Sequence, residues 1–376
     1  MKKVKNMEKL RILIVQCEMH NWPSARAWSY NIHFGWEEGL RANHVEFLTI
    51  MTPWISRAKE IIAGQHFDQV WINDLVLSSA RYGGEISESQ LAWLATLAPV
   101  RVGLLTETIY DYSPKEYAEI PDMQRTQAEV EKCLPHLTHL VAYDEADVAE
   151  IERRWSLSCL WGPCQVVGSL IHEQVPPPTY NQAFFSGSVY CGRQDWLNHP
   201  ILQKRLSRQS SPDEGTLDSK IFNILHNRYA RRLMQSRLAV PFYQMYLNSV
   251  RRIRQRSYVR WLRGLQSGVA VVNLPHFVKT YTPRVIEGMA AGRPVLSWEI
   301  PNRPRNKAMF EDGKDILLFN TPDELADHIQ HLQSDAVFAQ KITENARRRI
   351  RQFHTVDKRV QQILEWIQTG KVPTYE

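Results

Sequence analysis

The chain has 376 residues, of which 43% are hydrophobic and 23% are charged, a composition typical of globular proteins. Its length is about twice that of a typical single domain, so we expect two domains with separate apolar cores. No segment approaches the roughly 18 uninterrupted apolar residues that a membrane-spanning helix needs, which argues against an integral membrane protein. The basic start is followed only by the short apolar run from Ile12 to Val15, so we expect no signal peptide and a cytoplasmic protein.

The formal charge of +6 is concentrated in one segment. Between Lys220 and Arg263 there are eleven Lys or Arg residues and no Asp or Glu, whereas the rest of the chain has 35 basic and 40 acidic residues. Apolar residues recur through part of the segment at helical spacing, which predicts basic helices. Such helices can lie on anionic lipid, follow a nucleic acid, or pair with acidic residues of the same protein or of an oligomer. These interpretations stay open, with nucleic acid the least favoured.

Strand and helix patterns alternate in the first half of the chain. Apolar runs typical of buried strands are RILIVQ, VEFLTI, FDQVWIND, VRVGLLTE and THLVAYDE, and a helical pattern such as WSYNIHFGWEEGLRA separates two of them. Strands that alternate with helices imply right-handed crossovers and a parallel sheet covered on both faces. This predicts a doubly wound Rossmann-like domain, in which ligands bind at the carboxyl ends of the strands.

Three successive prolines, Pro176 to Pro178, interrupt this pattern, because proline fits neither a helix interior nor a central strand. The alternation then resumes with QAFFSGS, GVAVVNLP, RPVLSWE and KDILLFN. We therefore predict an α/β protein with two Rossmann-like, doubly wound domains. The predicted segments are a first domain at 1–175, a linker at 176–183, a second domain at 184–355 with a basic helical insertion at about 211–264, and a C-terminal helix and tail at 356–376 that pack back on the first domain.

The stretch YTPRVIEGMAAGRPVLSWE predicts a short helix followed by a buried strand. Thr282 suits the N-cap, Pro283 suits the first helical position, and Gly292 ends the helix. The amino end of a helix presents unpaired backbone N–H groups, and Lys279 and Arg284 would add positive charge beside them. An anion such as a phosphate would be stabilised there.

One turn further along this helix, Glu287 is a carboxylate that could accept hydrogen bonds from two vicinal hydroxyls, such as those of ribose. We expect it to share a side of the helix with Arg284 and Gly288. The alternative is that Arg284 and Glu287 pair with each other on the helix surface, which would contribute only about 0.3 kcal/mol.

This stretch resembles the carboxy-terminal domain of the GT-B glycosyltransferases, and within them the group 1 and spore-maturation CgeB-like proteins. Arg284, Glu287 and Gly292 match the pattern of Arg, two residues, Glu, small residues and Gly that precedes an apolar strand in that family. The resemblance continues in FFSGSVYCGR, SYVRWLRGLQSGVAVVNL and MFEDGKDILLFNTPDELADHI and covers about residues 184–364. It implies the GT-B architecture, in which the two domains face each other across a cleft. It also implies transfer of a sugar from a nucleotide-sugar donor, with a UDP- or GDP-sugar expected, to a glycan, lipid-linked or small-molecule acceptor.

The resemblance also implies a donor site in the second domain, where Glu287 would bind the ribose and Arg284 and Arg193 would lie near the diphosphate. Many retaining members have a second Glu eight positions before the ribose-binding one, and this chain has Lys279 there. The stereochemical outcome is therefore left open. The donor-binding residues that we expect are Gly187, Arg193, Tyr258, Asn273, Lys279, Tyr281, Thr282, Arg284 and Glu287.

The acceptor is expected on loops that follow the strands of the first domain. Each residue named here could equally have a capping or surface role, and a retaining reaction would need no protein base. The candidates for a general base are His20, Glu107 and Asp111, and the aromatic residues that could stack on a sugar are Trp22, Trp28 and Tyr110.

We expect neither a metal ion nor another cofactor, because the chain has no D-x-D triplet and the resemblance implies that a helix amino end and basic side chains neutralise the leaving diphosphate. The tetrad DEAD at Asp144 to Asp147 is interpreted as the capped start of a helix, since no phosphate-binding G-x-x-x-x-G-K-[ST] loop accompanies it. Two other functions stay open: a non-catalytic protein of the same fold that binds RNA or another polyanion, and a nucleotide-sugar epimerase. Peripheral contact with the inner membrane surface through the basic segment is compatible with a lipid-linked acceptor.

Overall fold

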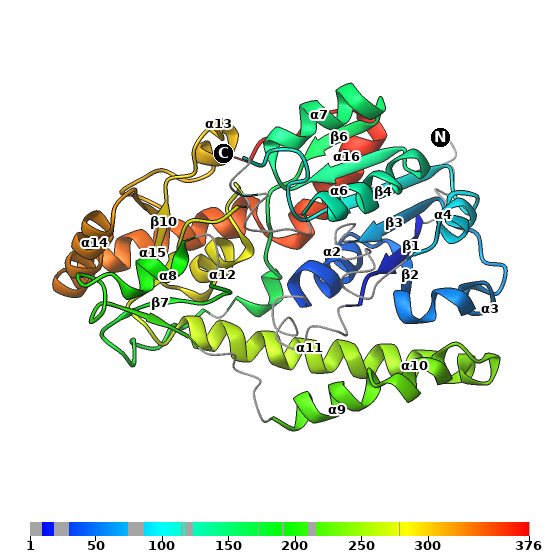
Figure 1. The fold of residues 1–376 in the computed structure, drawn as a ribbon, viewed down its shortest axis with the longest axis horizontal. Coiled ribbons are helices and arrows are strands. Elements are labelled where there is room, and N and C mark those ends of the chain that lie inside the picture. Colours follow the sequence, from blue (N-terminus) through cyan, green and yellow to red (C-terminus); the bar gives the residue numbers. More distant parts are fainter. Residues whose placement is uncertain are drawn as a thin grey trace, which may run out of the picture.

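The computed structural model describes residues 10–18, 30–73, 86–113, 116, 123–171, 173–189, 192–209, 216–277 and 279–375. Within these ranges, two parallel sheets lie beside each other and helices pack around both of them (Figure 1). The predicted alternation of strands and helices is therefore present in both halves of the chain.

The first sheet has the strand order β2-β1-β3-β4-β5-β6 within the described residues. Its order reverses between β1 and β3, and the carboxyl ends of strands at such a point are where doubly wound sheets bind ligands. Its strands are β1 (Arg11–Gln16), β2 (Glu46–Met51), β3 (Gln69–Asn73), β4 (Val100–Leu105), β5 (His139–Ala142) and β6 (Ser158–Trp161).

The two faces of this sheet are buried in separate apolar clusters, because side chains alternate along each strand. In β1, Leu13 and Val15 point into one cluster, and Ile12 and Ile14 point into the other. Both faces are therefore shielded from water, as the near-continuous apolar strands require.

The second sheet has the order β11-β10-β9-β7-β8 in the described part of the chain. The order reverses between β7 and β9, which places a second ligand-binding edge at the carboxyl ends of these two strands. Its strands are β7 (Ala183–Phe185), β8 (Leu206–Arg208), β9 (Ala270–Asn273), β10 (Val295–Trp298) and β11 (Leu317–Phe319).

The helices that surround the sheets vary widely in length. Those of the first domain are η2 (Tyr30–Phe34), α2 (Gly35–Ala42), η3 (Thr52–Arg57), α3 (Ala58–Ile62), α4 (Glu88–Ala95), α6 (Met123–Glu131), η5 (Leu134–His136), α7 (Glu145–Trp155) and η6 (Gly168–Leu170). Those that follow are α8 (Arg193–Asn198), α9 (Leu217–Leu225), α10 (Arg228–Met234), η7 (Arg237–Phe242), α11 (Tyr243–Leu265), α12 (Pro283–Ala291), α13 (Pro304–Ala308), α14 (Pro322–Ser334), α15 (Ala336–Phe353) and α16 (Val356–Thr369). None of the helices in the described ranges is long and apolar enough to cross a membrane.

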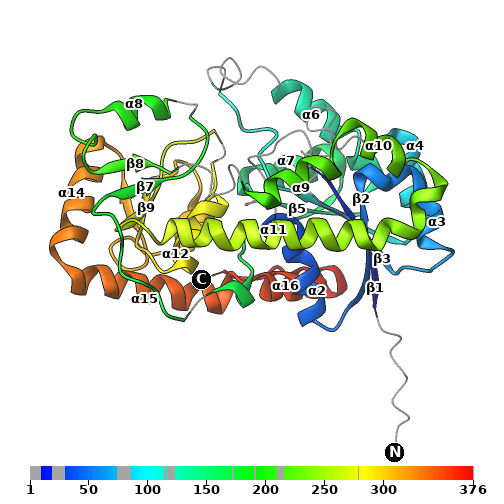
Figure 2. The ribbon, with the colours of Figure 1, turned by 90° about the horizontal axis from the view of Figure 1, so that it is seen from below.

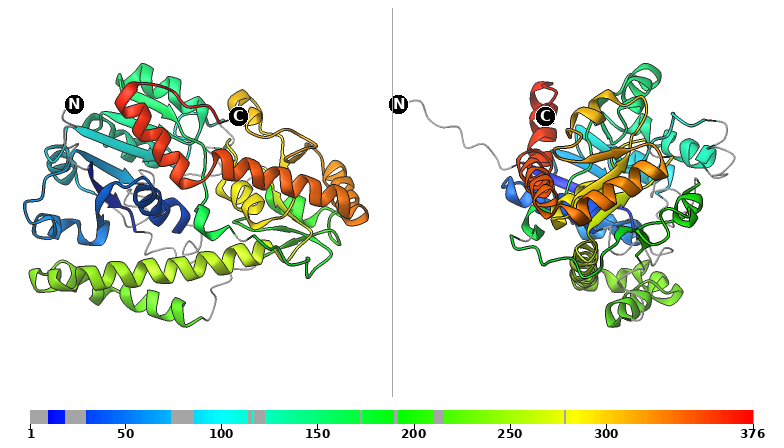
Figure 3. Two further views of the ribbon diagram at one scale, coloured as in Figure 1. Left: turned by 180° about the vertical axis from the view of Figure 1, so that it is seen from behind. Right: turned by 90° about the vertical axis from the view of Figure 1, so that its left-hand side faces the viewer.

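The chain passes between the domains twice, and the two crossings lie side by side. The first follows β6, and the second joins α15 to α16, which returns to the first domain (Figure 3). In the first crossing, the Val166 N–H donates to the carbonyl of His354, which belongs to the second crossing, at 2.9 Å. The Val166 carbonyl accepts the N–H of Val356, also in the second crossing, at 2.9 Å. The two crossings therefore form one interdomain joint.

The last helix, α16, packs against α2 of the first domain. A side chain on Gly39 would place its Cβ only 2.6 Å from Val360 Cγ2 and 2.7 Å from the Val356 carbonyl oxygen, so this close approach requires glycine. Val356, Val360 and Trp366 join the apolar cluster on that face of the first sheet.

The basic helical insertion belongs to the second domain in sequence, but most of it packs on the first. We refer to α9, α10, η7 and α11 together as the arm. Tyr243 of α11 donates its hydroxyl to the Thr49 carbonyl at 2.6 Å and accepts the Met51 N–H at 3.1 Å. The helix α11 then runs along the molecule until it reaches α12 (Figure 2).

Several arginines of the arm point inward and meet carboxylates. Arg251 binds Glu37 at 2.8 Å, and the fully buried Arg254 binds Glu18, which follows β1. These pairs support the interpretation in which part of the basic segment meets acidic residues of the same protein.

Candidate active site

The predicted helix of the opening motif is α12, and its amino end lies at the carboxyl edge of the second sheet. Pro283 is its first residue and Gly292 ends it in a left-handed conformation, with φ at 85°. Thr282 is the N-cap residue, but its hydroxyl does not cap the helix: it donates to Asn273 Oδ1 at 3.1 Å, at the end of β9. The helix start is thereby tied to the strand that precedes it.

Arg284 lies across the ends of β7 and β9. It donates to the Ser186 carbonyl and, at 3.1 Å, to Asn273 Oδ1. Gly187 follows with φ at +154°, and a Cβ there would lie 2.4 Å from an Arg284 nitrogen. Only glycine fits this turn, so the structure brings together Gly187, Asn273, Thr282 and Arg284, as one cluster at the point where the strand order reverses.

Arg193 connects the two loops beside this cluster. Its side chain is buried and donates to the carbonyls of Ser188 and Pro275 at 3.0 and 2.8 Å. Its guanidinium and that of Arg284 lie 5.1 and 4.9 Å from the ring of Phe185. Arg193 thus holds together the two loops that follow β7 and β9.

The two arginines make this edge of the sheet positive. Burial, together with the charges of Arg193 and Arg284, holds the pKa of His276 well below its ordinary value, so this imidazole is neutral. An anion placed among these groups would be attracted by the guanidinium charges and by the α12 amino end.

Glu287 is buried between the domains rather than exposed on the helix. Its carboxylate accepts from Asn31 Nδ2 of η2 at 3.2 Å and from Trp261 Nε1 of α11 at 2.9 Å. The surface-pair alternative with Arg284 is therefore wrong. Burial raises the pKa of Glu287 to about 7, although Trp261, Tyr258, Arg284 and Asn31 act in the opposite direction.

The aromatic surroundings of Glu287 come from both domains. Tyr258 is fully buried on α11, and its ring lies 5.8 Å from that of Tyr30 in η2. Gly288, expected on the side of Glu287, instead faces the sheet, where a Cβ would lie 3.0 Å from Val271 and Val295. Its small size therefore serves helix–sheet packing.

Lys279 lies in an ion-pair cluster between the domains. Its ammonium is 3.4 Å from the Asp111 carboxylate and 3.3 Å from that of Glu116, both in the first domain. Arg303 of the second domain bonds both Asp111 and the buried Asp144. The position at which many retaining members have a Glu is here part of an interdomain contact.

The acceptor-side candidates differ in their environments. His20, Trp22 and Trp28 lie outside the described residues. Burial would raise the pKa of Asp111, but Arg303 and Lys279 outweigh it and hold the pKa below its ordinary value, which makes this carboxylate a weak base. Glu107 is half-buried on the loop after β4.

Tyr110, on the same loop, lies against α7. Its hydroxyl accepts from Trp155 Nε1 at 2.8 Å, and Arg154 lies 4.4 Å from its ring. Asp147 shapes this loop, because its carboxylate accepts the backbone N–H groups of Ile109 and Tyr110, each at 3.1 Å. Burial and the neighbouring Asp144 raise the pKa of Asp147 to about 8.

Sequence reasoning missed the roles of several of these residues. Asp144 does cap α7, accepting from Ala146 N at 3.0 Å, but it also bonds Arg303 of the other domain. Tyr281, expected at the donor, turns its ring toward Phe310 at 5.5 Å and is buried in the core. No local sequence signal indicates such contacts, because the partners are far apart in the chain.

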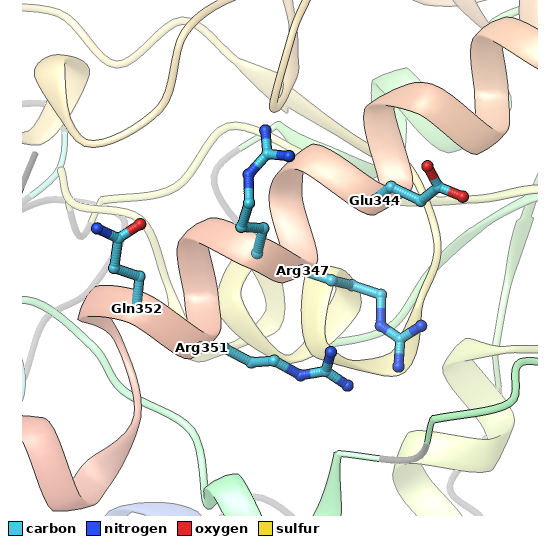
Figure 4. Close-up of a pocket in the computed structure, with 5 residues that line it drawn as sticks. Glu344, Arg347, Arg351 and Gln352 are labelled. Carbon is cyan, nitrogen blue, oxygen red and sulfur yellow. The ribbon is translucent and has the colours of Figure 1, made fainter.

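Two surface hollows lie elsewhere, on α15. One of about 380 Å³ is lined by Glu344, Arg347, Arg348, Arg351 and Gln352 (Figure 4). Arg351 pairs with the Glu173 carboxylate at 2.9 Å, and Arg347 donates to the Glu173 carbonyl at 3.2 Å. The second hollow, of about 490 Å³, reaches Val269 and Pro294, which precede β9 and β10. The first hollow therefore adjoins the interdomain joint, and the second adjoins the amino edge of the second sheet. The α12 amino end lies at the opposite, carboxyl edge of that sheet.

In the described part of the chain, no group of three or more His, Cys, Asp or Glu residues is arranged to hold a metal ion.

Comparisons with known proteins connect this arrangement to an enzyme class. Residues 217–365 match a family model described as Glycosyl transferase-like, about two fifths of the chain. The matched region runs from α9 into α16 and contains α12 with Arg284 and Glu287. Among curated proteins, none matches the sequence.

Solved structures are similar to this chain at low sequence identity, and the first of them shares its two-domain fold. Sucrose-phosphate synthase from Thermosynechococcus elongatus has a TM-score of 0.57 and 13% identity, with 96% of this chain and 100% of that chain covered. HepE from Anabaena in complex with UDP and glucose has a TM-score of 0.49 and 13% identity over the same shares. A putative UDP-N-acetylglucosamine 2-epimerase from Listeria monocytogenes has a TM-score of 0.49 and 10% identity, with 96% and 97% covered.

The family match and the shared fold define the protein as a glycosyltransferase with the GT-B fold. The predicted fold class and the predicted enzyme class are thereby confirmed.

Proposed function

We propose that this glycosyltransferase binds a nucleotide-sugar donor, with UDP or GDP as the nucleotide, at the amino end of α12. It would transfer the sugar to a hydroxyl of an acceptor held by the first domain. The observation that carries the proposal is the cluster of Gly187, Asn273, Thr282 and Arg284 where the strand order of the second sheet reverses. The CgeB-like relationship belongs to this proposal as well.

The chemistry expected of this cluster is stabilisation of a leaving diphosphate. Negative charge develops on the diphosphate as the glycosidic bond breaks, and fixed positive groups stabilise charge that appears only in the transition state. Arg284 and the α12 N–H groups are the groups that we assign to this role, with Arg193 as the brace. This assignment requires no metal ion.

Glu287 is the proposed ligand of the ribose. In the structure its two carboxylate oxygens accept from Asn31 and Trp261, one of which belongs to each domain. We expect the ribose hydroxyls to replace Asn31 when the domains separate to admit the donor. Closure around the bound donor would then bring donor and acceptor together.

The acceptor is assigned to the loops after β1 and β4. Among the base candidates, Asp111 is poorly suited to proton transfer because two cations hold its carboxylate ionised, which leaves His20 and Glu107 as the candidates for the base. A peripheral membrane contact through the arm would suit a lipid-linked acceptor. A nucleotide-sugar epimerase would instead release free nucleoside diphosphate without an added acceptor.

Titration calorimetry with UDP and GDP tests the donor site. Arg284→Ala and Glu287→Ala should each weaken binding roughly tenfold to a hundredfold, because a hydrogen bond to a charged group contributes about 1.5–3 kcal/mol. Glu344→Ala, an exposed change on α15, serves as the control. Unchanged affinity in the folded Glu287→Ala protein would remove the ribose assignment, and unchanged affinity in both variants would remove the donor site.

A further inference from the structure

The outward surface of the arm is unusually apolar. Six of the ten exposed large hydrophobic residues in the described part of the chain lie between 224 and 245. We define the docking face by these residues: Ile224, Tyr229, Leu233, Leu238, Phe242 and Met245. The most exposed of them, Leu238, retains 82% of its accessible surface.

The arm already has a separate apolar face toward the protein. Phe222, Met234, Ala239, Tyr243 and Tyr246 are buried against the first domain and the neighbouring helices. A helical layer that only covers a domain needs this inner face, and its outer face is normally polar. The outer apolar residues therefore require a partner of their own.

The spacing of the outer residues places them on shared sides of the helices. Tyr229 and Leu233 are one turn apart on α10. Leu238, Phe242 and Met245 follow at intervals of four and three residues along η7 and the start of α11. In an α-helix this spacing places side chains on one side, which aligns Tyr229 with Leu233 and Phe242 with Met245 in a stripe. Leu238 lies on the 3-10 helix η7, which has three residues per turn, so it belongs to the docking face by its exposure and not by its spacing.

Basic residues surround this stripe. Arg256 and Arg260 turn to Asp218, the one acidic residue of the described arm, and Arg251 and Arg254 turn to the first domain. Other basic side chains remain exposed, among them Arg237, with 83% of its side chain accessible although it lies 3.3 Å from Glu60. Besides Arg256, which is exposed although it pairs with Asp218, the exposed basic residues are Lys220, Arg228, Arg232, Arg237, Arg252 and Arg263.

We propose that the docking face binds the surface of an anionic lipid bilayer, with the apolar side chains inserted among the acyl chains and the exposed arginines at the headgroups. This inference builds on the peripheral contact proposed above. Interleaved apolar and basic side chains match the surface of an anionic bilayer, where negatively charged headgroups lie over apolar acyl chains. A nucleic acid would attract the arginines but would leave Leu233, Leu238 and Met245 in water.

The position of the arm makes this contact useful for the reaction. Met51, which bonds Tyr243 of the arm, is the last residue of β2, and Glu18, which pairs with Arg254, follows β1. The arm therefore adjoins the carboxyl edge of the first sheet, where the acceptor is expected. A bilayer under the arm would present lipid-linked hydroxyls next to that edge.

Vesicle cosedimentation of the full chain, without nucleotide, tests the proposal. Wild type should bind vesicles that mix phosphatidylcholine and phosphatidylglycerol, and should not bind pure phosphatidylcholine. Arg228→Glu/Arg232→Glu should weaken binding at least roughly tenfold, because each basic residue near an anionic surface contributes about a fivefold factor. Leu233→Ser/Leu238→Ser/Phe242→Ser should weaken it by a similar factor, since bound apolar area is lost.

Val337→Ser is the matched control, because Val337 is 79% exposed on α15, outside the docking face. Circular dichroism and UDP or GDP binding check that each variant is folded and that the donor site is intact. The proposal is overturned if wild type ignores anionic vesicles, or if the triple Ser variant binds them as tightly as wild type does. Tight binding of an RNA homopolymer that the triple Ser change leaves unaltered, together with no vesicle binding, would assign the arm to nucleic acid instead.

Discussion

Replacing Glu287 with Gln should remove a specific part of the pH dependence of folding stability. Burial raises the pKa of Glu287 from 4.5 to about 7 in the folded protein. The folded state therefore holds this proton more tightly than the unfolded state does. Below about pH 4.5 the proton is bound in both states, and as the pH rises through about 7 the folded state must accept a buried charge.

The magnitude follows from the difference between the two pKa values. Each unit corresponds to about 1.4 kcal/mol, so the contribution of Glu287 to the free energy of unfolding should decrease by about 3 kcal/mol between the two pKa values. A Gln at this position is neutral at every pH and keeps an oxygen that can accept from Trp261. The NH2 group of this Gln would face Asn31. Rotation of the Asn31 side chain would turn its Oδ1, a buried acceptor with no hydrogen bond in the structure, toward that NH2 group.

Urea unfolding of wild type and Glu287→Gln, followed by fluorescence from about pH 5 to about pH 8, measures this contribution. Taking the difference between the two proteins cancels groups that titrate in both, including Asp147. The Gln variant should gain stability relative to wild type as the pH rises. A difference that stays constant over this range would refute the reasoning, and Glu344→Gln, an exposed change, should give that constant difference.

Two further substitutions test the interior and the donor cluster. Arg254→Met should lower the free energy of unfolding by about 3–5 kcal/mol, because Glu18 would remain buried without its cation, and Glu18→Gln in the same chain should restore part of the loss in urea unfolding. Gly187→Ala should weaken nucleoside diphosphate binding about tenfold in calorimetry by displacing Arg284, to which its Cβ would come within 2.4 Å. Gly313→Ala, at φ +74° with open space around it, is the matched control and should leave that affinity unchanged.

The sequence predicts well those features that depend on neighbouring residues. Apolar runs place nine of the strands, because burial on two faces demands near-continuous apolar strands, whereas the short strands β6 and β8 were not predicted. The ends of α12 follow from Pro283 and Gly292, whose backbone preferences are local. The positive edge of the second sheet follows from the same stretch.

Features that depend on distant partners were not predictable. The sequence predicts Glu287 as a ribose ligand, with a surface pair with Arg284 as the alternative, but it does not predict that Asn31, 256 positions away, and Trp261 enclose this side chain. The sequence predicts the arm as an insertion of the second domain, whereas in the structure Tyr243 of the arm bonds the end of β2 in the first domain. No periodicity encodes which surfaces of two domains will meet, so these contacts need the three-dimensional structure.

The helix α11 has a mechanical consequence for donor entry. It extends about 34 Å without a break and is anchored to the first domain at Tyr243 and Arg254, while Trp261 reaches α12 in the second. A continuous helix that is attached to both domains resists a rotation of one domain against the other about the interdomain joint. Because α11 continues into β9 of the second sheet, we expect separation of the domains to strain its anchors at Tyr243 and Arg254 and to break the bond between Asn31 and Glu287.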